Sequence, residues 1–314
     1  MTKIFIDGSE GTTGLRIFER FRNRNDIELL EIPSEQRKNS EIKKQFINES
    51  DITFLCLPDS AAIEAVSLVE NPNVRIIDAS TAHRTLPDWV YGFPELSMQH
   101  RESIAVGKRI AVPGCYASGF MSIVYPLVKL GIAPSDYPFA CNAVSGYSGA
   151  GKKAIALYES ADREKAFDAP RLYAMGQMHK HLKEMQIISG LKTKPTFQPF
   201  VCDYYSGMIV NIPLQTELLT KKTTAENVHA ALANYYKNSV MVKVMPFAEN
   251  GTEDGFLSAN KLAGFDFMEI YVAGNEERIS ISSCFDNLGK GASGAAVQCM
   301  NIMLGCEETF GLSV

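Results

Sequence analysis

The chain has 314 residues, of which 46% are hydrophobic and 21% are charged, and its formal net charge at pH 7 is −5. This length allows two domains with cores of their own. Because there is no basic excess, the composition argues against nucleic acids and anionic membranes as partners. The N-terminal residues show no signal-peptide pattern and no apolar run reaches membrane-spanning length, so we expect a cytoplasmic protein.

The first part of the sequence alternates short apolar segments with helical patterns. Strands are expected at Lys3–Asp7, Ile27–Ile32, Ile52–Leu57 and Val74–Asp78, with helices such as Ser60–Glu70 between them. This alternation predicts a doubly wound parallel sheet of the Rossmann type.

The first expected strand runs into the loop GSEGTTG, residues 8–14, and then into a helical pattern. Gly8, Gly11 and Gly14 are spaced G-x-x-G-x-x-G, a variant of the dinucleotide fingerprint G-x-G-x-x-G. Glycines in this position let backbone N–H groups approach a pyrophosphate at the start of a helix. The loop therefore indicates a bound dinucleotide, and the alternative is a plain tight turn.

The end of the second expected strand bears on which dinucleotide binds. Glu31 lies where an acidic residue usually holds the ribose hydroxyl of NAD. Ser34, Arg37 and Lys38 follow it and could instead hold the 2′-phosphate of NADP, unless Arg37 and Lys38 belong to a solvated loop. The pattern favours NADP.

Cys115 is placed where a strand is expected to end and a helix to begin. Ile104–Val112 is mostly apolar and β-branched, Pro113-Gly114 ends that run, and a helical face follows up to a stop at Gly131. Helix N-termini favour anions, so a thiol there is more easily ionised and more nucleophilic. The alternative is that Cys115 packs as a small hydrophobic residue.

The seven cysteines are residues 56, 115, 141, 202, 284, 299 and 306. Their number is odd, their spacing is irregular, and no pair is separated by two residues. This pattern disfavours both a disulfide framework and a zinc site, and it suits a reducing compartment.

From about Pro138 the sequence changes character, because strand-like runs follow one another with fewer helices between them. These runs are Phe139–Val144, Met208–Leu214, Val240–Met245, Phe267–Val272 and Ile279–Phe285. They predict a mainly antiparallel α+β domain. A last helix is expected at Ala292–Leu304, and it could belong to either half. Cys115 lies near the junction of the halves.

Acid–base and anion-binding candidates are few. His179 and His181 alternate along a polar segment; a His-x-His pair can bind metal, but no matching thiol or carboxylate set accompanies it, so no metal is expected. His83 could border a site, His100 is expected at the surface, and His229 is expected in a helix at residues 225–236.

Arg84 is the best candidate for binding a substrate anion, with a surface ion pair as the alternative. Ser145, Ser148 and Gly149 are further anion-pocket candidates.

Six motifs resemble the N-acetyl-gamma-glutamyl-phosphate reductase family, and its shorter form most closely. They occur in family order and are DASTAHR (78–84), YGFPEL (91–96), VPGCYASG (112–119), SGYSGAGK (145–152), HKHLKEMQ (179–186) and DNLGKGASGAAVQ (286–298). The resemblance covers nearly the whole chain.

The resemblance implies an NADPH-binding Rossmann domain at residues 1–114, to which a C-terminal helix at about 291–314 returns. It implies a catalytic domain at 115–290, similar to those of semialdehyde and glyceraldehyde-phosphate dehydrogenases, and a tetramer. Cys115 matches the nucleophile and His179 or His181 the acid/base; Lys183 stands where proline is usual, which affects the expected loop geometry. The cofactor-binding residues that it implies are Gly8, Gly11, Thr12, Thr13, Gly14, Ser34, Arg37, Lys38, Pro58, Gly149 and Asn287.

The reaction implied is reduction of an acyl phosphate, N-acetyl-L-glutamyl 5-phosphate, to the semialdehyde through a cysteine thioester in arginine biosynthesis. A positioned acid/base and a covalent intermediate are the two means of acceleration that such residues offer. The alternatives are another semialdehyde dehydrogenase with an aspartyl or aminoadipyl substrate, and a non-catalytic NADP-binding sensor that keeps the fold.

Overall fold

The structure is a computed structural model and describes residues 1–22, 24–37 and 39–314. The chain divides into two compact units. Unit 1 comprises Met1–Pro113 and Ala292–Leu312, and unit 2 comprises Gly114–Gly291 and Ser313–Val314. Within the described residues, no helix combines the length and the apolar character needed to cross a bilayer.

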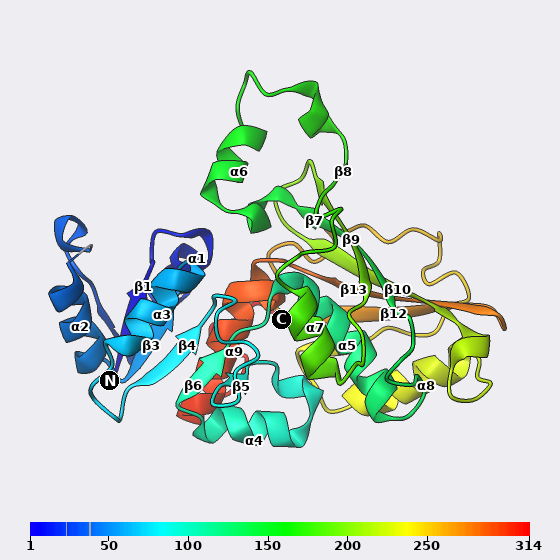
Figure 1. Ribbon diagram of the computed structural model, residues 1–314, viewed down its shortest axis with the longest axis horizontal. Helices are drawn as coiled ribbons and strands as arrows, with labels where there is room; N and C mark the ends of the chain where they lie inside the picture. Colours follow the sequence, from blue (N-terminus) through cyan, green and yellow to red (C-terminus); the bar gives the residue numbers. More distant parts are fainter. Residues whose placement is uncertain (23, 38) are drawn as a thin grey trace. The chain divides into compact units, whose positions relative to one another are not determined.

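Unit 1 contains a six-stranded sheet in the order β2-β1-β3-β4-β6-β5, and every neighbouring pair is parallel (Figure 1). The strands are β1 (Thr2–Asp7), β2 (Ile27–Leu30), β3 (Ile52–Leu55), β4 (Arg75–Asp78), β5 (Val90–Tyr91) and β6 (Arg109–Ala111). All four residues of β3 are buried, as expected for a strand covered on both faces.

Helices cover both faces of this sheet. They are α1 (Thr12–Phe21), α2 (Ser40–Glu49), α3 (Asp59–Ser67), α4 (Met98–Val106) and α9 (Gly294–Leu304). Along β1, Ile4 and Ile6 join the core cluster that contains residues of α1, α4 and α9. Phe5 points the other way and joins the cluster formed with α2 and α3. Two cores on opposite faces of one parallel sheet confirm the predicted doubly wound fold.

One predicted element of unit 1 is wrong. Ile104–Val112 is not a single strand, because α4 occupies its first part and the strand β6 begins only at Arg109. Ser97 caps the start of α4 by accepting a hydrogen bond from the His100 N–H group, and Gly107 ends the helix. The β-branched Ile104, which favoured a strand, is the fully buried contact of that helix.

Unit 2 contains a seven-stranded sheet in the order β11-β12-β13-β10-β7-β9-β8. Its strands are β7 (Ala140–Gly146), β8 (Arg171–Leu172), β9 (Thr196–Cys202), β10 (Met208–Gln215), β11 (Val242–Val244), β12 (Met268–Gly274) and β13 (Arg278–Phe285). The pairs β11–β12 and β7–β9 are parallel and the others are antiparallel. This mixed sheet confirms the predicted α+β class of the second half.

One face of this sheet is covered by α5 (Cys115–Lys129) and α8 (Ala225–Tyr236), with α7 (Leu182–Ser189) packed on α5. Gly119 allows α5 to approach β10, because a Cβ atom there would lie 2.6 Å from Val210 Cγ2. On the opposite face of β10, Asn211 Nδ2 donates to Ser280 Oγ and Ser282 Oγ of β13. The sheet therefore has an apolar face under the helices and a face with small polar side chains.

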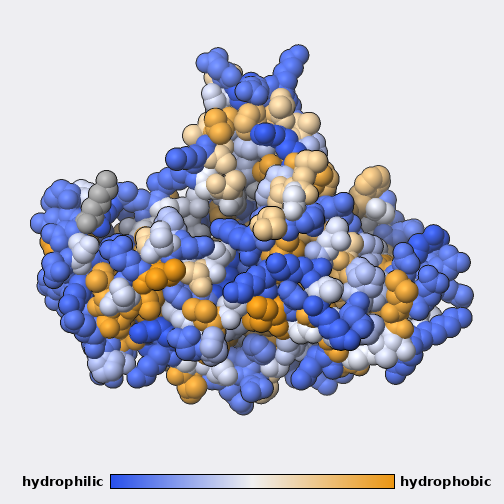
Figure 2. Space-filling view, in the orientation of Figure 1, coloured by the Kyte–Doolittle hydropathy of each residue, from blue (hydrophilic) through white to orange (hydrophobic). Residues whose placement is uncertain are grey.

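A segment of unit 2 that includes α6 (Lys152–Tyr158) and β8 extends away from the rest of its sheet (Figure 1). It exposes apolar side chains, among them Leu157 and Met175. Hydrophobic patches lie between hydrophilic residues on this extension (Figure 2). The same segment leads into His179 and His181.

Candidate active site

Cys115 is the first residue of α5 in unit 2 and is partly exposed. Gly114 is the N-cap residue and has no side chain with which to cap the helix. The first N–H groups of any helix have no partner within the helix, and the helix dipole places partial positive charge at this end. The Cys115 thiol therefore lies where a thiolate is stabilised.

The other cysteines of unit 2 lie in a different environment. Cys141, Cys202 and Cys284 are buried, and burial raises the pKa of the Cys284 thiol to about 12 and that of Cys141 still further. All seven cysteines are among the described residues, and none of them forms a disulfide. In unit 2, Cys115 alone combines partial exposure with a helix N-terminus.

Glu184 connects the start of α5 to a histidine. Its Oε2 atom accepts a hydrogen bond of 3.2 Å from the Gly114 N–H group, and its Oε1 atom lies 4.0 Å from His181 Nε2. His181 and Glu184 are almost fully buried, and their i,i+3 spacing places both on one face of the turn that begins α7. A buried imidazole with a carboxylate beside it is suited to accept and return a proton.

His179 stabilises the start of α7. Its Nδ1 atom accepts a 3.1 Å hydrogen bond from the backbone N–H group of His181, so the proton of a neutral His179 ring is on Nε2. The two imidazole rings are 4.6 Å apart and nearly perpendicular. Lys183 is exposed in the first turn of α7, and the helix forms without the proline expected there.

Two tyrosines complete this group. The Tyr173 hydroxyl donates to the Tyr116 hydroxyl at 3.0 Å, and the Tyr116 ring packs against His179 and His181. Burial raises the pKa of Tyr116 well above its usual value, and the nearby Tyr173 and Cys115 add to this. Both phenols therefore stay neutral hydrogen-bonding groups. We call Cys115, Tyr116, Tyr173, His179, His181 and Glu184 the thiol cluster.

A second group of predicted residues meets beside the cluster. Asn287 Nδ2 donates to Ser148 Oγ at 2.9 Å, and Asn287 Oδ1 accepts from the Gly207 N–H group at 2.8 Å. A Cβ atom on Gly149 would lie 3.0 Å from Asn287 Nδ2, and one on Gly291 would lie 3.0 Å from Cys115 Cβ. The segment around Asn287 therefore passes next to Cys115.

Ser145 is at the end of β7, and its hydroxyl donates to the Gly146 carbonyl oxygen at 3.1 Å. A hydrogen bond between Ser145 and Tyr116 offsets a small part of the increase that burial causes in the pKa of Tyr116. The structure thus brings Ser145 to the thiol cluster.

In unit 1 the glycine loop has the geometry that a phosphate-binding turn needs. Gly8 has φ of +88°, and a Cβ atom there would lie 2.4 Å from the Cys56 carbonyl oxygen. A Cβ atom on Gly14 would lie 2.2 Å from the Gly8 carbonyl oxygen. Gly11 is the N-cap of α1, so Thr12 and Thr13 begin the helix with their N–H groups at its anion-favouring end. These residues fit a dinucleotide pyrophosphate.

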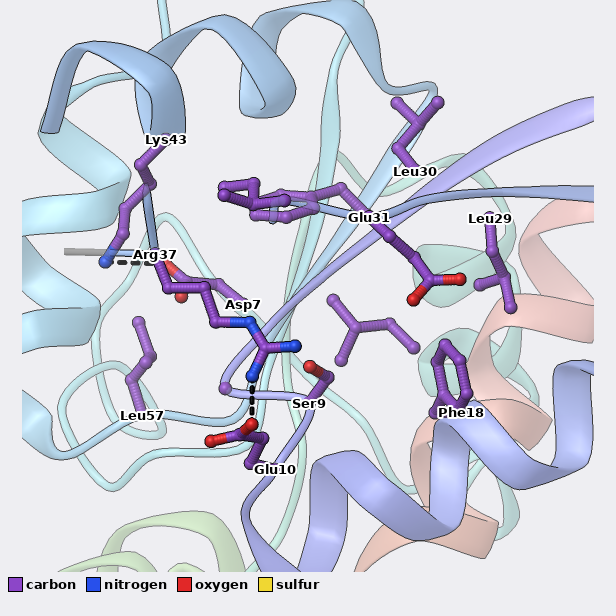
Figure 3. A pocket seen from close by; sticks show the side chains of 14 residues that line it. Asp7, Ser9, Glu10, Phe18, Leu29, Leu30, Glu31, Arg37, Lys43 and Leu57 are labelled. Carbon is purple, nitrogen blue, oxygen red and sulfur yellow. Dashed lines mark hydrogen bonds and ion pairs between the residues drawn. The ribbon is translucent and has the colours of Figure 1, made fainter. Parts of the chain in front are cut away.

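A cavity of about 200 Å³ lies beside this loop, and we call it the glycine-loop cavity (Figure 3). Its described lining includes three carboxylates, Asp7, Glu10 and Glu31, and two cations, Arg37 and Lys43. Figure 3 shows each cation turned toward a carboxylate: Arg37 pairs with Glu10, and Lys43 Nζ lies 3.0 Å from Asp7 Oδ2. Burial raises the pKa of Asp7, and the hydrogen bond and positive charge of Lys43 offset part of this increase.

The remaining cofactor candidates lie elsewhere in unit 1 or outside the described residues. Ser34 begins a short 3₁₀ turn, and its hydroxyl donates to Glu35. Pro58 is the N-cap residue of α3. Lys38 lies outside the described residues. Lys43, which the sequence analysis did not single out, lines the cavity because α2 turns it toward β1.

Arg84 is buried in unit 1, so the alternative of a surface ion pair is wrong. Its Nε atom donates to the Val112 carbonyl oxygen at 2.8 Å and its Nη2 atom to the Ala79 carbonyl oxygen at 3.1 Å. Backbone carbonyls thus orient the guanidinium group. Beside it, His83 pairs with the buried Asp78 at 2.7 Å and stacks on Trp89.

The other two histidines have structural contacts. His100 Nδ1 lies 2.8 Å from the Ser97 hydroxyl at the start of α4, and His229 Nε2 lies 2.8 Å from the Met245 carbonyl oxygen. Within the part of the chain that the structure describes, no group of three or more His, Cys, Asp and Glu side chains is arranged to hold a metal ion.

Comparison with protein families and curated proteins gives a consistent result. Residues 3–104 match the family described as semialdehyde dehydrogenase, NAD binding domain, and residues 115–287 match semialdehyde dehydrogenase, dimerisation domain. N-acetyl-gamma-glutamyl-phosphate reductase 2 of Nostoc sp. is 46% identical over 318 residues, which cover 99% of each chain. The N-acetyl-gamma-glutamyl-phosphate reductase of Burkholderia lata is 44% identical over 97% of each chain.

Solved structures of similar fold include aspartate semialdehyde dehydrogenases. That of Francisella tularensis has a TM-score of 0.71 at 16% identity and covers 97% of this chain and 100% of its own. Aspartate semialdehyde dehydrogenase II of Vibrio cholerae has a TM-score of 0.70 at 15% identity and covers 97% of this chain and 98% of its own. At this identity the likeness establishes the fold.

Proposed function

Since the chain belongs to the N-acetyl-gamma-glutamyl-phosphate reductase family, we propose that it reduces N-acetyl-L-glutamyl 5-phosphate to N-acetyl-L-glutamate 5-semialdehyde and phosphate in arginine biosynthesis. The observation that carries this proposal is the position of Cys115 as the first residue of α5. The Gly114 N–H group, just before it, donates a hydrogen bond to the Glu184 carboxylate, which lies beside His181. A thiol, a histidine and a carboxylate in this order are the parts that thioester chemistry requires.

NADPH is the cofactor and supplies the hydride when bound. The fit of unit 1 supports this, because Gly8 and Gly14 leave no room for side chains in the pyrophosphate loop and Thr12 and Thr13 begin α1. Arg37, from the glycine-loop cavity, is suited to hold a 2′-phosphate. Ser34, Lys38, Pro58, Gly149 and Asn287 remain candidate cofactor contacts.

Cys115 acts first. Its thiolate attacks the acyl carbon of the substrate, a carbon–sulfur bond forms, and the carbon–oxygen bond to phosphate breaks. N–H groups at the start of α5 stabilise the oxyanion that develops on the carbonyl oxygen. The hydride that bound NADPH would supply converts the thioester carbonyl into an alkoxide, which takes a proton from the His181 imidazolium formed when Cys115 lost its own proton. His181 takes this proton back as the carbonyl re-forms and the carbon–sulfur bond breaks, so the aldehyde leaves and the thiolate is restored.

His181 is the group that we assign to proton transfer, because Glu184 is beside its Nε2 atom and both are buried. His179 has a different task, since its Nδ1 atom is engaged by the His181 N–H group. Through that hydrogen bond His179 aligns His181 for proton transfer. Both histidines therefore belong to the proposed catalytic set with Cys115.

The substrate carries a carboxylate and a phosphate, and the proposed partners for them are Arg84, Ser145 and Ser148. Arg84 is suited to an anion because it carries a planar cationic guanidinium group that backbone carbonyls orient. The hydroxyl of Ser148 already accepts from Asn287 and can still donate its own proton.

The deciding experiment is phosphate-dependent oxidation of N-acetylglutamate semialdehyde with NADP, followed by the absorbance of the reduced nicotinamide. We expect turnover with this aldehyde to exceed turnover with aspartate semialdehyde and aminoadipate semialdehyde, and NADP to be preferred to NAD. A higher kcat/KM with either of the other aldehydes would reassign the substrate. Binding of NADP with no turnover of any aldehyde would favour the sensor alternative.

We further propose a cytoplasmic homo-oligomer, a tetramer by resemblance, with no nucleic acid or membrane partner. The match to a dimerisation domain supports association of copies through unit 2. The net charge of −5 supports the absence of polyanionic partners. Light scattering on the purified protein tests the number of subunits, and a monomeric mass would contradict the proposal.

A further inference from the structure

The backbone just before the two histidines is strained. Ala174 and Gln177 have φ of 52° and 55°, and they are the only non-glycine residues with positive φ in the described part of the chain. Residues other than glycine, asparagine and aspartate rarely adopt this left-handed backbone conformation. It persists only where surrounding contacts enforce it. Both residues lie between β8 and His179.

The Gln177 side chain supplies that enforcement. Its Nε2 atom donates to the Phe197 carbonyl oxygen at 2.7 Å, and its Oε1 atom accepts from the Phe197 N–H group at 2.8 Å. The amide thus forms with Phe197, in β9, the two hydrogen bonds that a residue of a neighbouring strand would form. We call this pair of bonds the amide clamp.

The amide clamp acts on the same residues that contact the histidines. The Phe197 ring packs edge-on against His179, with centroids 5.1 Å apart, and against Tyr116 at 5.2 Å. Tyr173 at the other end of the segment is bonded to β9 through its N–H group and the Pro199 carbonyl oxygen. The segment from Tyr173 to Gln177 is therefore fixed to β9 at both ends.

His179 follows Gln177 by two residues and transmits the constraint to His181 through the hydrogen bond at its Nδ1 atom. A shift of the segment would move His179 relative to Phe197 and would weaken the bond that aligns His181 at the start of α7. Displacements of about 1 Å in a catalytic group can lower turnover by about 10²-fold.

We propose that Gln177 is a positioning residue: its amide clamp on Phe197 holds the strained segment so that His179 and His181 keep the alignment that proton transfer needs. The proposal rests on the proposed function for its kinetic consequence, while the alignment itself is a property of unit 2. Gln177 acts only through the histidines and not by contact with substrate or cofactor.

Two variants separate the amide clamp from the backbone strain. Gln177→Ala removes both hydrogen bonds and keeps a side chain at positive φ. Gln177→Gly removes the same bonds but relieves the strain, so it is the variant expected to fold without difficulty. Gln198→Ala is the matched control, because Gln198 is an exposed glutamine next to Phe197 in β9.

We expect both Gln177 variants to lower kcat about tenfold with KM for NADP within about twofold, since the glycine-loop cavity is not touched. The acidic limb of the pH profile of kcat should shift, because the environment of the histidines changes. Gln198→Ala should match the wild type in all three quantities. Wild-type kcat in both Gln177 variants, or in Gln177→Gly alone, would overturn the proposal.

A measurement without turnover makes the inference independent of the reaction. Titration of the histidine signals by NMR should show the His179 and His181 resonances shifted in Gln177→Gly and unchanged in Gln198→Ala. If the wild type lacked reductase activity, the proposed function would be wrong. The spectra would still test whether the amide clamp aligns the two histidines. Identical histidine spectra in Gln177→Gly and the wild type would refute it.

Discussion

In unit 2 the side chains beside Cys115 include the buried Tyr116, His181 and Glu184, whereas the Glu10–Arg37 pair at the glycine-loop cavity of unit 1 is much more exposed. Glu184 is 2% exposed and His181 is 6% exposed. The side chains of Glu10 and Arg37, by contrast, are 71% and 37% exposed. The two regions therefore differ in dielectric environment as well as in composition.

The difference reflects what each region has to do. Proton transfer and thioester formation need fixed geometry, and electrostatic interactions are stronger where water is excluded. Recognition of a dissociating phosphate needs charges that can exchange partners, and exposed ion pairs contribute only about 0–1 kcal/mol. Changes in the thiol cluster should therefore lower kcat by orders of magnitude, and changes in the cavity should alter KM by smaller factors that depend on salt.

The largest effect is expected for Cys115→Ser. Loss of the nucleophile should lower kcat by at least about 10³-fold, because a serine hydroxyl is not ionised at neutral pH and replaces the group that forms the covalent intermediate. Binding of NADPH, measured by fluorescence titration, should be unchanged. Cys306→Ser is the matched control and should keep wild-type turnover. A Cys115→Ser enzyme with near wild-type activity would refute the thioester route.

The next largest effect distinguishes the two histidines. His181→Asn should lower kcat by about 10²-fold or more, because it removes the proposed proton carrier. His179→Asn should cost only about tenfold, since the asparagine Oδ1 atom can still accept the His181 N–H hydrogen bond. Steady-state kinetics with thermal denaturation as a folding control would measure both. A greater loss in His179→Asn would reverse the assignment.

A smaller effect is expected in the glycine-loop cavity. Arg37→Ala should raise KM for NADPH by about tenfold and leave kcat nearly unchanged, because it removes one charge-assisted contact with the 2′-phosphate. KM for NADH, which has no such phosphate, should not rise. The NADPH effect should shrink as salt is added, since exposed charges are screened. Equal losses with both cofactors would place Arg37 outside the 2′-phosphate site.

The smallest effect has the opposite sign. Glu10→Gln should lower KM for NADPH about two- to threefold, because the Glu10 carboxylate competes with the phosphate for Arg37 and repels it. Glu28→Gln is the control, because it removes the same single negative charge from an exposed position in β2. An unchanged or higher KM for NADPH in Glu10→Gln would show that the Arg37 pair does not hinder the cofactor.

Much of unit 1 could be predicted from the sequence because its signals are local. The run Ile52–Leu55 is continuously apolar, and such runs of a strand's length between helical patterns indicate parallel sheets. The glycine loop was recognisable because Gly8 and Gly14 are required by close approach of the backbone, which no other residue permits. The strand predicted at residues 104–112 was wrong because capping by Ser97 starts a helix that extends into this segment, despite its β-branched residues.

The thiol cluster could be predicted only in part. The position of Cys115 follows from Pro113-Gly114 and the helical pattern after it. The contact of Glu184 with Gly114 joins residues 70 apart in the chain, and the amide clamp joins Gln177 to Phe197 across 20 residues. Such contacts depend on how α5, α7 and β9 pack, which no local pattern specifies. The i,i+3 spacing of His181 and Glu184 was the one available signal.

The position of α9 has a consequence for biosynthesis of the chain. Ala295, Met300 and other residues of α9 complete the core that Ile4 and Ile17 begin, although almost the whole polypeptide separates them. Chains emerge from the ribosome N-terminus first, and domains tend to fold as they emerge. Although α1 and α4 cover part of this face of the sheet, the rest stays exposed until translation is nearly finished. Chaperone demand in the cell should therefore fall mainly on the N-terminal half.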